Sequence, residues 1–304
     1  MIYQFPTFPM RAAEFDESRL PGFQEIREHW AAEALNVVSL DFGCLAMAPP
    51  KSNAAAQHFT LQAQYACIIE NFSMAQWIAT NVGPCTCSMA YSMGLFAAIA
   101  HAGAIEFQSA LELARDVCVA AHQTATENTW AIGAAVDFPE ARLRVLMREA
   151  SAQLEVTDLY GANTVLFTGL KEPVTQVLDR ALSEGASSTR LIPVTAPFHT
   201  TQLQVIEPAI SNALDRMRLR APSWPILSSI TQELLTTEDD VRAEICRNVS
   251  RPMNWFSTLK AGLGRGEGGL VESGASFILT DLARDLFPDA CHYRDFRDMQ
   301  GSHD

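Results

Sequence analysis

The sequence lacks the marks of a membrane protein, a secreted protein and a nucleic-acid binder. Its longest apolar runs, such as "GLFAAIAHAGAI", are shorter than the roughly 20 residues that cross a bilayer. The N-terminus "MIYQFPTFPMR" has no basic segment followed by an apolar one, so no secretory signal is visible. Asp and Glu number 35 against 22 Lys and Arg, and a formal net charge of −13 disfavours binding to phosphate backbones. We therefore expect a cytoplasmic protein with no membrane span and no nucleic-acid partner.

Closely spaced cysteines and basic clusters are also scarce. The seven cysteines are scattered, and only Cys85 and Cys87 lie close together, at a spacing unlike the two-residue gap of zinc sites. The sequence therefore predicts no metal site. The one short basic stretch, "RMRLR" at 216–220, is explained more simply as the solvated end of a helix than as a local anion-binding patch.

The chain does contain enough apolar residues for a large core. With 304 residues, of which 48% are hydrophobic, it can form a large domain that carries a smaller one. Between 129 and 194 the pattern predicts a strand "TWAIGAAV", a helix "PEARLRVLMREASAQL", strands "LEVTDLYG" and "NTVLFTG", a helix "EPVTQVLDRALSEG" and a strand "STRLIPV". This βαββαβ order is typical of a ferredoxin-like subdomain, which we place at 128–196.

Outside this block, long helical stretches alternate with short apolar strands. The predicted strands are "LNVVSL" or its neighbourhood, "CTCSMA", "PILSSI", "GLVESG" and "SFILTD". Such alternation indicates an α/β sheet with helices on both faces. We therefore predict a larger α/β domain, made of 1–127 and 197–304, into which the subdomain is inserted.

Ser92 stands between a short apolar run and a long run of helix formers, in "TCSMAYSMGLFAAIAHAGAIEF". A serine before a helix is commonly a cap, whose hydroxyl accepts a free backbone N–H. However, "AYSMG" differs from the G-x-S-x-G nucleophile elbow only in having Ala90 for the first glycine, and such an elbow needs small residues on both sides. At the start of a helix the hydroxyl would also be well placed for acyl transfer. Both interpretations stay open at this point.

A serine nucleophile also needs a base. Among the seven histidines, His199 in "IPVTAPFHT" is distinctive, because it follows the last strand of the predicted subdomain. That position is the junction of two domains, where clefts commonly form. His199 is therefore the candidate base, and an ordinary loop residue is the alternative.

These segments, in their order, resemble the malonyl-CoA:acyl-carrier-protein transacylase family, the acyltransferases of fatty-acid and polyketide synthesis. "FPTFPMR" stands where the family has Phe-Pro-Gly-Gln-Gly-Ser-Gln, and "AYSMGLFAAIAHAGAIEF" where it has Gly-His-Ser-x-Gly-Glu and a helix. "PVTAPFHT", "APSWPILSS", "RPMNW" and "VESGASFILTDL" follow in the family's order. The resemblance implies an α/β-hydrolase-like large domain with an inserted ferredoxin-like subdomain.

The resemblance also implies a mechanism. Ser92 would attack a thioester, His199 would take its proton, and an acyl-serine would separate two half-reactions. The backbone N–H groups of Met93 and Arg11 would form the oxyanion hole, and the backbone carbonyl of Asn254 would orient the histidine. No cofactor is implied beyond the phosphopantetheine arm of a carrier protein or CoA, which belongs to the substrate. The implied partner is an acyl carrier protein, with acyl-CoA as a possible donor, and the implied state is a monomer.

Several positions depart from the family. Val117 replaces the arginine that holds the malonyl carboxylate, a bidentate pairing that no neutral side chain can replace. Arg115 lies about 200° around the helix from that position and cannot substitute. Such a pocket has little reason to bury a carboxylate, so we expect an uncharged, larger acyl group. The other predicted pocket residues are Tyr91 and Leu95, which replace His and Glu, together with Tyr160 and Phe198. The first loop, residues 7–11, is also bulkier than in the family.

Three functions are compatible with these residues. The first is an acyltransferase for a non-carboxylated acyl group, and the second is a carrier-protein thioester hydrolase of the same fold. Water and a pantetheine thiol would use the same Ser92 and His199, so the sequence does not separate the two. The third is an inactive binding homologue, in which the altered first loop has abolished catalysis.

Overall fold

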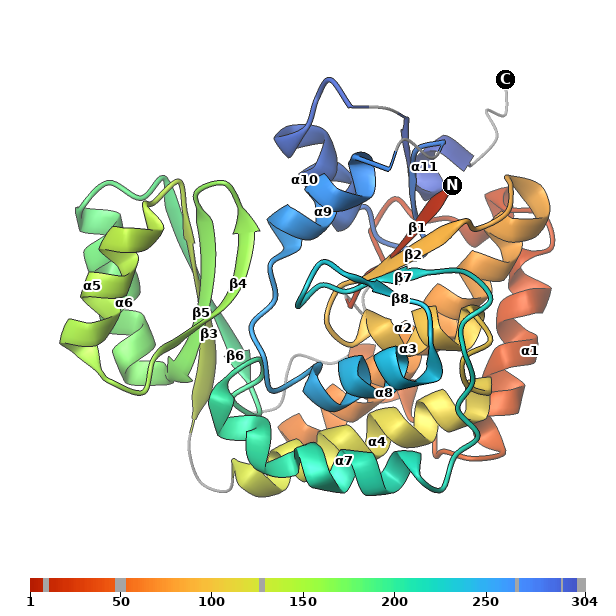
Figure 1. The fold of residues 1–304 in the computed structure, drawn as a ribbon, viewed down its shortest axis with the longest axis horizontal. Helices are drawn as coiled ribbons and strands as arrows, with labels where there is room; N and C mark the ends of the chain where they lie inside the picture. Colours follow the sequence, from red (N-terminus) through yellow and green to blue (C-terminus); the bar gives the residue numbers. More distant parts are fainter. Residues whose placement is uncertain (8–10, 47–52, 126–128, 266–267, 291, 300–304) are drawn as a thin grey trace.

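The chain folds into two domains, each built on its own sheet (Figure 1). The computed structural model describes residues 1–7, 11–46, 53–125, 129–265, 268–290 and 292–299. Within these ranges, no helix is both long and apolar enough to cross a membrane.

The large domain is built on a six-stranded sheet in the order β10-β9-β1-β2-β7-β8. Neighbouring strands are parallel except β8, which runs antiparallel to β7. Every residue of β1 and β2 is buried, as expected for parallel strands that are covered on both faces. The strands are β1 (Ile2–Phe5), β2 (Cys87–Ala90), β7 (Ile226–Leu227), β8 (Leu234–Leu235), β9 (Leu270–Glu272) and β10 (Tyr293–Arg294).

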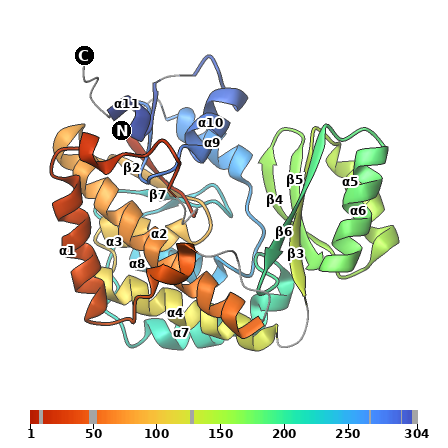
Figure 2. The same cartoon turned by 180° about the vertical axis from the view of Figure 1, so that it is seen from behind.

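Helices cover both faces of this sheet. In Figures 1 and 2, α2, α3, α4, α7 and α8 lie on one side of the strands, and α9 and α10 lie on the other. The α-helices of the large domain are α1 (Phe23–Leu35), α2 (Asn53–Asn81), α3 (Gly94–His101), α4 (Phe107–Thr124), α7 (Glu207–Leu214), α8 (Glu238–Arg247), α9 (Trp255–Leu263), α10 (Ile278–Leu286) and α11 (Phe296–Met299), with short 3-10 helices η1 (Glu17–Arg19), η2 (Phe42–Ala46) and η3 (Thr201–Ile206). The predicted α/β architecture is confirmed.

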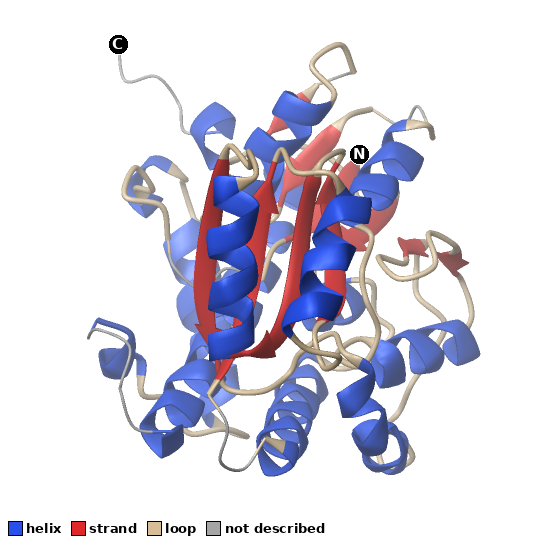
Figure 3. Cartoon of the chain, turned by 90° about the vertical axis from the view of Figure 1, so that its left-hand side faces the viewer, coloured by secondary structure: helices blue, strands red, loops and turns tan. Residues whose placement is uncertain are grey.

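The small domain is an antiparallel sheet in the order β4-β5-β3-β6, with two helices on one face (Figure 3). Along the chain its elements are β3 (Trp130–Val136), α5 (Glu140–Ala150), β4 (Glu155–Gly161), β5 (Thr164–Leu170), α6 (Lys171–Ser183) and β6 (Ser188–Val194). This is the predicted βαββαβ order. The domain has its own core, in which Phe167 of β5 packs with Leu143 and Leu146 of α5 and Val177 of α6.

Two of the predicted strands are wrong. "SFILTD" is the start of α10, where the buried Glu272 carboxylate accepts the Thr280 backbone N–H at 2.8 Å and so supports the first turn. "LNVVSL" is the end of α1 and a turn that follows it. Both are short apolar runs, whose period does not separate a strand from a buried turn of helix.

Asp158 is one of the residues that connect the two domains. Asp158 of β4, in the small domain, forms an isolated parallel β-bridge with Met253, which precedes α9 in the large domain. The Asp158 carboxyl accepts the backbone N–H of Trp255 at 3.0 Å and the hydroxyl of Tyr91 at 2.8 Å. Asp158 is 1% exposed, and burial raises its pKa to about 7, although the Trp255 N–H and the Tyr91 hydroxyl act in the opposite direction.

Replacing Asp158 by Asn tests how the ionisation of this buried carboxyl affects the stability of the fold. Because the folded-state pKa lies above the unfolded value, the native state binds the extra proton, and this contribution to stability is lost as pH rises toward 7. An amide cannot ionise, so the melting temperature of Asp158→Asn should rise relative to wild type between about pH 5 and pH 8. Calorimetry at both pH values measures this, with Asp179→Asn on the exposed face of α6 as the control. If the difference in melting temperature between wild type and Asp158→Asn is the same at both pH values, the raised pKa of Asp158 is contradicted.

Candidate active site

Ser92 occupies a sharp turn between β2 and α3. Its φ is +51°, a left-handed conformation that is uncommon for a residue with a side chain. A Cβ at Gly94 would collide with the backbone carbonyl oxygens of Phe5 and Pro6 on the neighbouring segment, the latter at 2.7 Å. The helix can therefore start this close to β1 only because residue 94 is glycine. This is the geometry of a nucleophile elbow.

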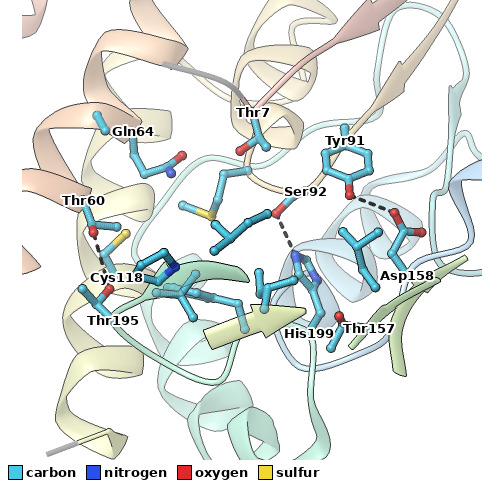
Figure 4. Close-up of a pocket in the computed structure, with 18 of the residues that line it drawn as sticks. Thr7, Thr60, Gln64, Tyr91, Ser92, Cys118, Thr157, Asp158, Thr195 and His199 are labelled. Atoms are coloured by element: carbon cyan, nitrogen blue, oxygen red, sulfur yellow. Dashed lines mark hydrogen bonds between the residues drawn. The ribbon is translucent and has the colours of Figure 1, made fainter. Parts of the chain in front are cut away.

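The Ser92 hydroxyl points at a histidine instead of capping the helix. Its Oγ lies 2.7 Å from Nε2 of His199 (Figure 4). No side chain caps the start of α3. The cap interpretation of Ser92 is therefore wrong, because the hydroxyl is turned toward the cavity.

His199 is held rigidly in a turn after β6. Its φ is +63°, and its backbone N–H donates to the carbonyl of Val249 at 2.7 Å. The side chain is buried, and burial lowers the pKa of His199 from 6.5 to about 4, although the carbonyls of Arg251 and Asn248 beside it act in the opposite direction. The imidazole is therefore neutral at neutral pH and can accept a proton.

The carbonyls beside the histidine are not the predicted one. Asn254 uses its carbonyl to accept the N–H and hydroxyl of Thr258, and its side chain caps α9 by accepting the Ser257 N–H at 2.9 Å. The backbone acceptors beside His199 are Arg251 and Asn248, and the Asn248 side chain also donates to the Ser92 carbonyl at 3.2 Å. The Asn254 carbonyl is thus used by the first turn of α9, and its role in orienting His199 stays a prediction.

The two predicted oxyanion donors are placed differently. Met93 directly follows the serine, precedes the first residue of α3 and lines the cavity. Arg11 does not line it, and its guanidinium pairs with Glu70 at 2.9 Å and Glu17 at 3.1 Å. The loop before Arg11, residues 8–10, lies outside the described part of the chain. The role of the Arg11 N–H therefore stays a prediction.

A cavity of about 380 Å³ opens beside the Ser92 hydroxyl, between the two domains. Its walls come from α2, α4, the small-domain sheet and the segments around Ser92, His199 and Met253. The lining is mostly apolar and consists of Thr7, Phe59, Thr60, Ala63, Gln64, Tyr91, Ser92, Met93, Cys118, Ile132, Thr157, Asp158, Leu166, Ile192, Pro193, Val194, Thr195, Phe198, His199 and Met253.

Of the five predicted pocket residues, Tyr91 and Phe198 line this cavity and three do not. Leu95 and Val117 are buried in the core of the large domain. The next residue on α4, Cys118, faces the cavity instead, because each helical residue turns by about 100°. Tyr160 packs edge-on against the Tyr91 ring at 5.6 Å and supports that wall from behind.

Asp158 was missed by the sequence analysis. It is the only Asp, Glu, Lys or Arg among the described residues that line the cavity. The available signal was an acidic residue inside the predicted strand "LEVTDLYG", where β-strands are depleted in Asp. Its partner Tyr91 is next to Ser92, so a contact between the two domains is also part of the site.

Comparison with known proteins agrees with this arrangement. No family model matches the chain. The malonyl CoA-acyl carrier protein transacylase of Escherichia coli K12 is 24% identical over 263 residues, which is 85% of this chain and 84% of that protein. The polyketide biosynthesis protein ThaF of Burkholderia thailandensis is 19% identical over 256 residues, 84% of this chain and 22% of that protein.

Solved structures share the fold over nearly the whole chain. The malonyl CoA-acyl carrier protein transacylase of Coxiella burnetii superposes with a TM-score of 0.83 at 20% identity, covering 98% of this chain and 95% of that one. A malonyl-transacylase in complex with a type II polyketide synthase acyl-carrier protein gives a TM-score of 0.80 at 20% identity, covering 97% of this chain and 94% of that one. Over most of its length the chain is therefore similar in sequence to malonyl-CoA:acyl-carrier-protein transacylases and has the same fold.

Proposed function

We propose that the protein is an acyltransferase that moves an uncharged acyl group between thioesters through an ester on Ser92. The observation that carries the proposal is the 2.7 Å contact between Ser92 Oγ and a buried, neutral His199, at the mouth of an apolar cavity. An inactive binding homologue would have no use for this geometry.

In the first half-reaction, Ser92 Oγ attacks the thioester carbonyl carbon while its proton moves to Nε2 of His199. The negative charge on the carbonyl oxygen develops near the start of α3, where the Met93 N–H can donate to it. The carbon–sulfur bond then breaks, and the leaving thiolate takes the proton from Nε2. The product is an acyl-Ser92 ester and a free thiol.

In the second half-reaction, the thiol of an acceptor gives its proton to Nε2 and its sulfur attacks the ester carbon. The carbon–oxygen bond breaks, and Ser92 Oγ recovers the proton. Water can replace the thiol in this step, with a carboxylic acid as the product. Hydrolysis is therefore the second outcome that an experiment must distinguish.

The walls of the cavity support an uncharged acyl group. Among the described lining residues there is no Lys or Arg to pair with a carboxylate, and the only acidic residue is Asp158. A malonyl carboxylate would be desolvated without a partner and would face a buried acid. The relatives are named for malonyl transfer, so this chain would differ from them in its acyl group.

We further propose that an acyl carrier protein delivers or receives the acyl group. One relative of the same fold was solved in complex with its acyl-carrier protein, and others are named for acyl transfer to such a carrier. One relative is named for polyketide biosynthesis, which agrees with a role in fatty-acid or polyketide synthesis. No cofactor other than the pantetheine arm of the substrate is needed for these steps.

Acyl-enzyme formation tests the proposal directly. We expect butyryl-CoA to add one butyryl group to the protein and malonyl-CoA to react more slowly, because the carboxylate has no partner in the cavity. Intact mass and peptide mapping measure the adduct, and Ser92→Ala should form none. A holo acyl carrier protein is then added, and transfer to it or release of butyrate separates transfer from hydrolysis. Faster labelling by malonyl-CoA would contradict the uncharged acyl group.

Replacing the base gives a second measure. His199→Asn keeps a residue that tolerates the left-handed backbone, but its amide cannot take the serine proton. We expect acylation by butyryl-CoA to slow by at least about a hundredfold. The melting temperature of the variant serves as the folding control. A rate within a few-fold of wild type would show that His199 is not the base.

The pH dependence follows from the burial of His199. The base is active when neutral, and because its pKa is lowered to about 4, activity is lost only in acid. Asp158 has a pKa of about 7 in the same cavity, so the profile is measured in Asp158→Asn. We expect kcat/KM for acylation of that variant to be level between about pH 6 and pH 8. A step near pH 6.5 would contradict the assignment.

A further inference from the structure

The wall of the cavity that α2 forms carries neutral polar side chains. Thr60 and Gln64 are four residues apart on α2, so they lie on one face of that helix, and both line the cavity. Thr195 joins them from the segment after β6. In Figure 4, Thr60, Gln64 and Thr195 lie on the opposite side of the Ser92–His199 pair from Asp158.

Gln64 has an unused hydrogen-bonding group at this wall. Its Oε1 is buried and has no hydrogen-bond partner among the described residues. A buried amide oxygen without a partner costs free energy, and such groups are rare in native proteins unless a ligand or water satisfies them. An amide carries both an acceptor and a donor, so either orientation of the group could bind a hydroxyl.

The two threonines belong to an uncharged network. Thr195 Oγ1 lies 3.5 Å from Thr60 Oγ1 and 2.8 Å from Nε2 of His122. Thr60 Oγ1 donates to the Ala56 carbonyl at 2.9 Å. Burial lowers the pKa of His122 to about 4, so the ring is neutral at neutral pH. The wall therefore offers hydroxyl and amide groups to a neutral polar substituent and offers no charge to a carboxylate.

Asp158, on the other side of the catalytic pair, is a weaker candidate for substrate recognition. Each of its carboxyl oxygens already accepts a hydrogen bond, from Tyr91 or from Trp255. Its position is also fixed by the strand bridge to Met253. Gln64 also lines the cavity, and its buried Oε1 has no hydrogen-bond partner among the described residues. Nδ1 of His199 is likewise without a partner there, but that ring already contacts Ser92 Oγ, so the free polar group outside the catalytic pair is on α2.

We propose that Gln64, assisted by Thr60 and Thr195, binds a hydroxyl group on the acyl chain, so that the protein prefers hydroxyacyl thioesters to plain alkanoyl ones. The inference rests on the proposed acyl transfer through Ser92 and names its substrate class. A hydroxyl both donates and accepts, which matches an amide next to two threonine hydroxyls. The apolar remainder of the lining accommodates the hydrocarbon part of the chain.

The test compares butyryl-CoA with its 3-hydroxy and 4-hydroxy derivatives as donors. The measured quantity is kcat/KM for acylation of Ser92, followed by intact mass. We expect the wild type to prefer at least one hydroxybutyryl isomer by about three- to tenfold, the value of one neutral hydrogen bond. Gln64→Met keeps the length of the side chain and removes the amide, so the preference should fall to about one.

Two further variants serve as a control for the substitution and as a test of Thr60. Gln57→Met makes the same chemical change on α2 outside the cavity lining and should leave both rates and their ratio as in wild type. Thr60→Val keeps the shape of the side chain and should reduce the preference by about two- to threefold. A measurable butyryl rate in Gln64→Met shows that this variant is folded.

The outcomes separate this inference from the proposed function. Equal rates for butyryl and both hydroxybutyryl donors in wild type, or a preference that survives Gln64→Met, would overturn the role of Gln64. Acylation of Ser92 by butyryl-CoA would still support acyl transfer in that case. No adduct on Ser92 with any donor would overturn both.

Discussion

The hydrogen bond between Ser92 and His199 is the contact on which the rest of the site depends. The two residues are 107 positions apart and both have left-handed backbone conformations, so neither side chain reaches the other by local structure alone. Gly94 lets α3 begin against the carbonyl oxygens of Phe5 and Pro6, and the Val249 carbonyl accepts the backbone N–H of His199. Burial then keeps the imidazole neutral, as acyl transfer requires.

The same surroundings set the character of the cavity. Asp158 links the small domain to the segment before α9 and accepts a hydrogen bond from the hydroxyl of Tyr91, the residue before Ser92. The same buried carboxyl therefore contacts both the segment before α9 and the cavity wall next to Ser92. The opposite wall, on α2, carries neutral polar groups. The described lining therefore holds one buried acid and no Lys or Arg.

The period of apolar residues along the chain predicted the helices and strands of the small domain. The βαββαβ order was evident because each segment from β3 to β6 has a clear period and clear ends. "SFILTD" was assigned to the wrong class because its helix depends on a buried carboxylate from β9. Val117 was placed on the wall although its neighbour Cys118 faces the cavity, a difference of one residue that only the rotation of α4 decides.

The sequence by itself determined the βαββαβ order of the small domain, the small residues on both sides of Ser92 and the valine at position 117, because each depends on residues close together in the chain. Tertiary structure decided which side chains meet. It placed the carbonyls of Asn248 and Arg251 beside His199, paired Tyr91 with Asp158 and left the buried Oε1 of Gln64 without a hydrogen-bond partner among the described residues. These contacts join distant segments, and their geometry follows from how the two domains pack.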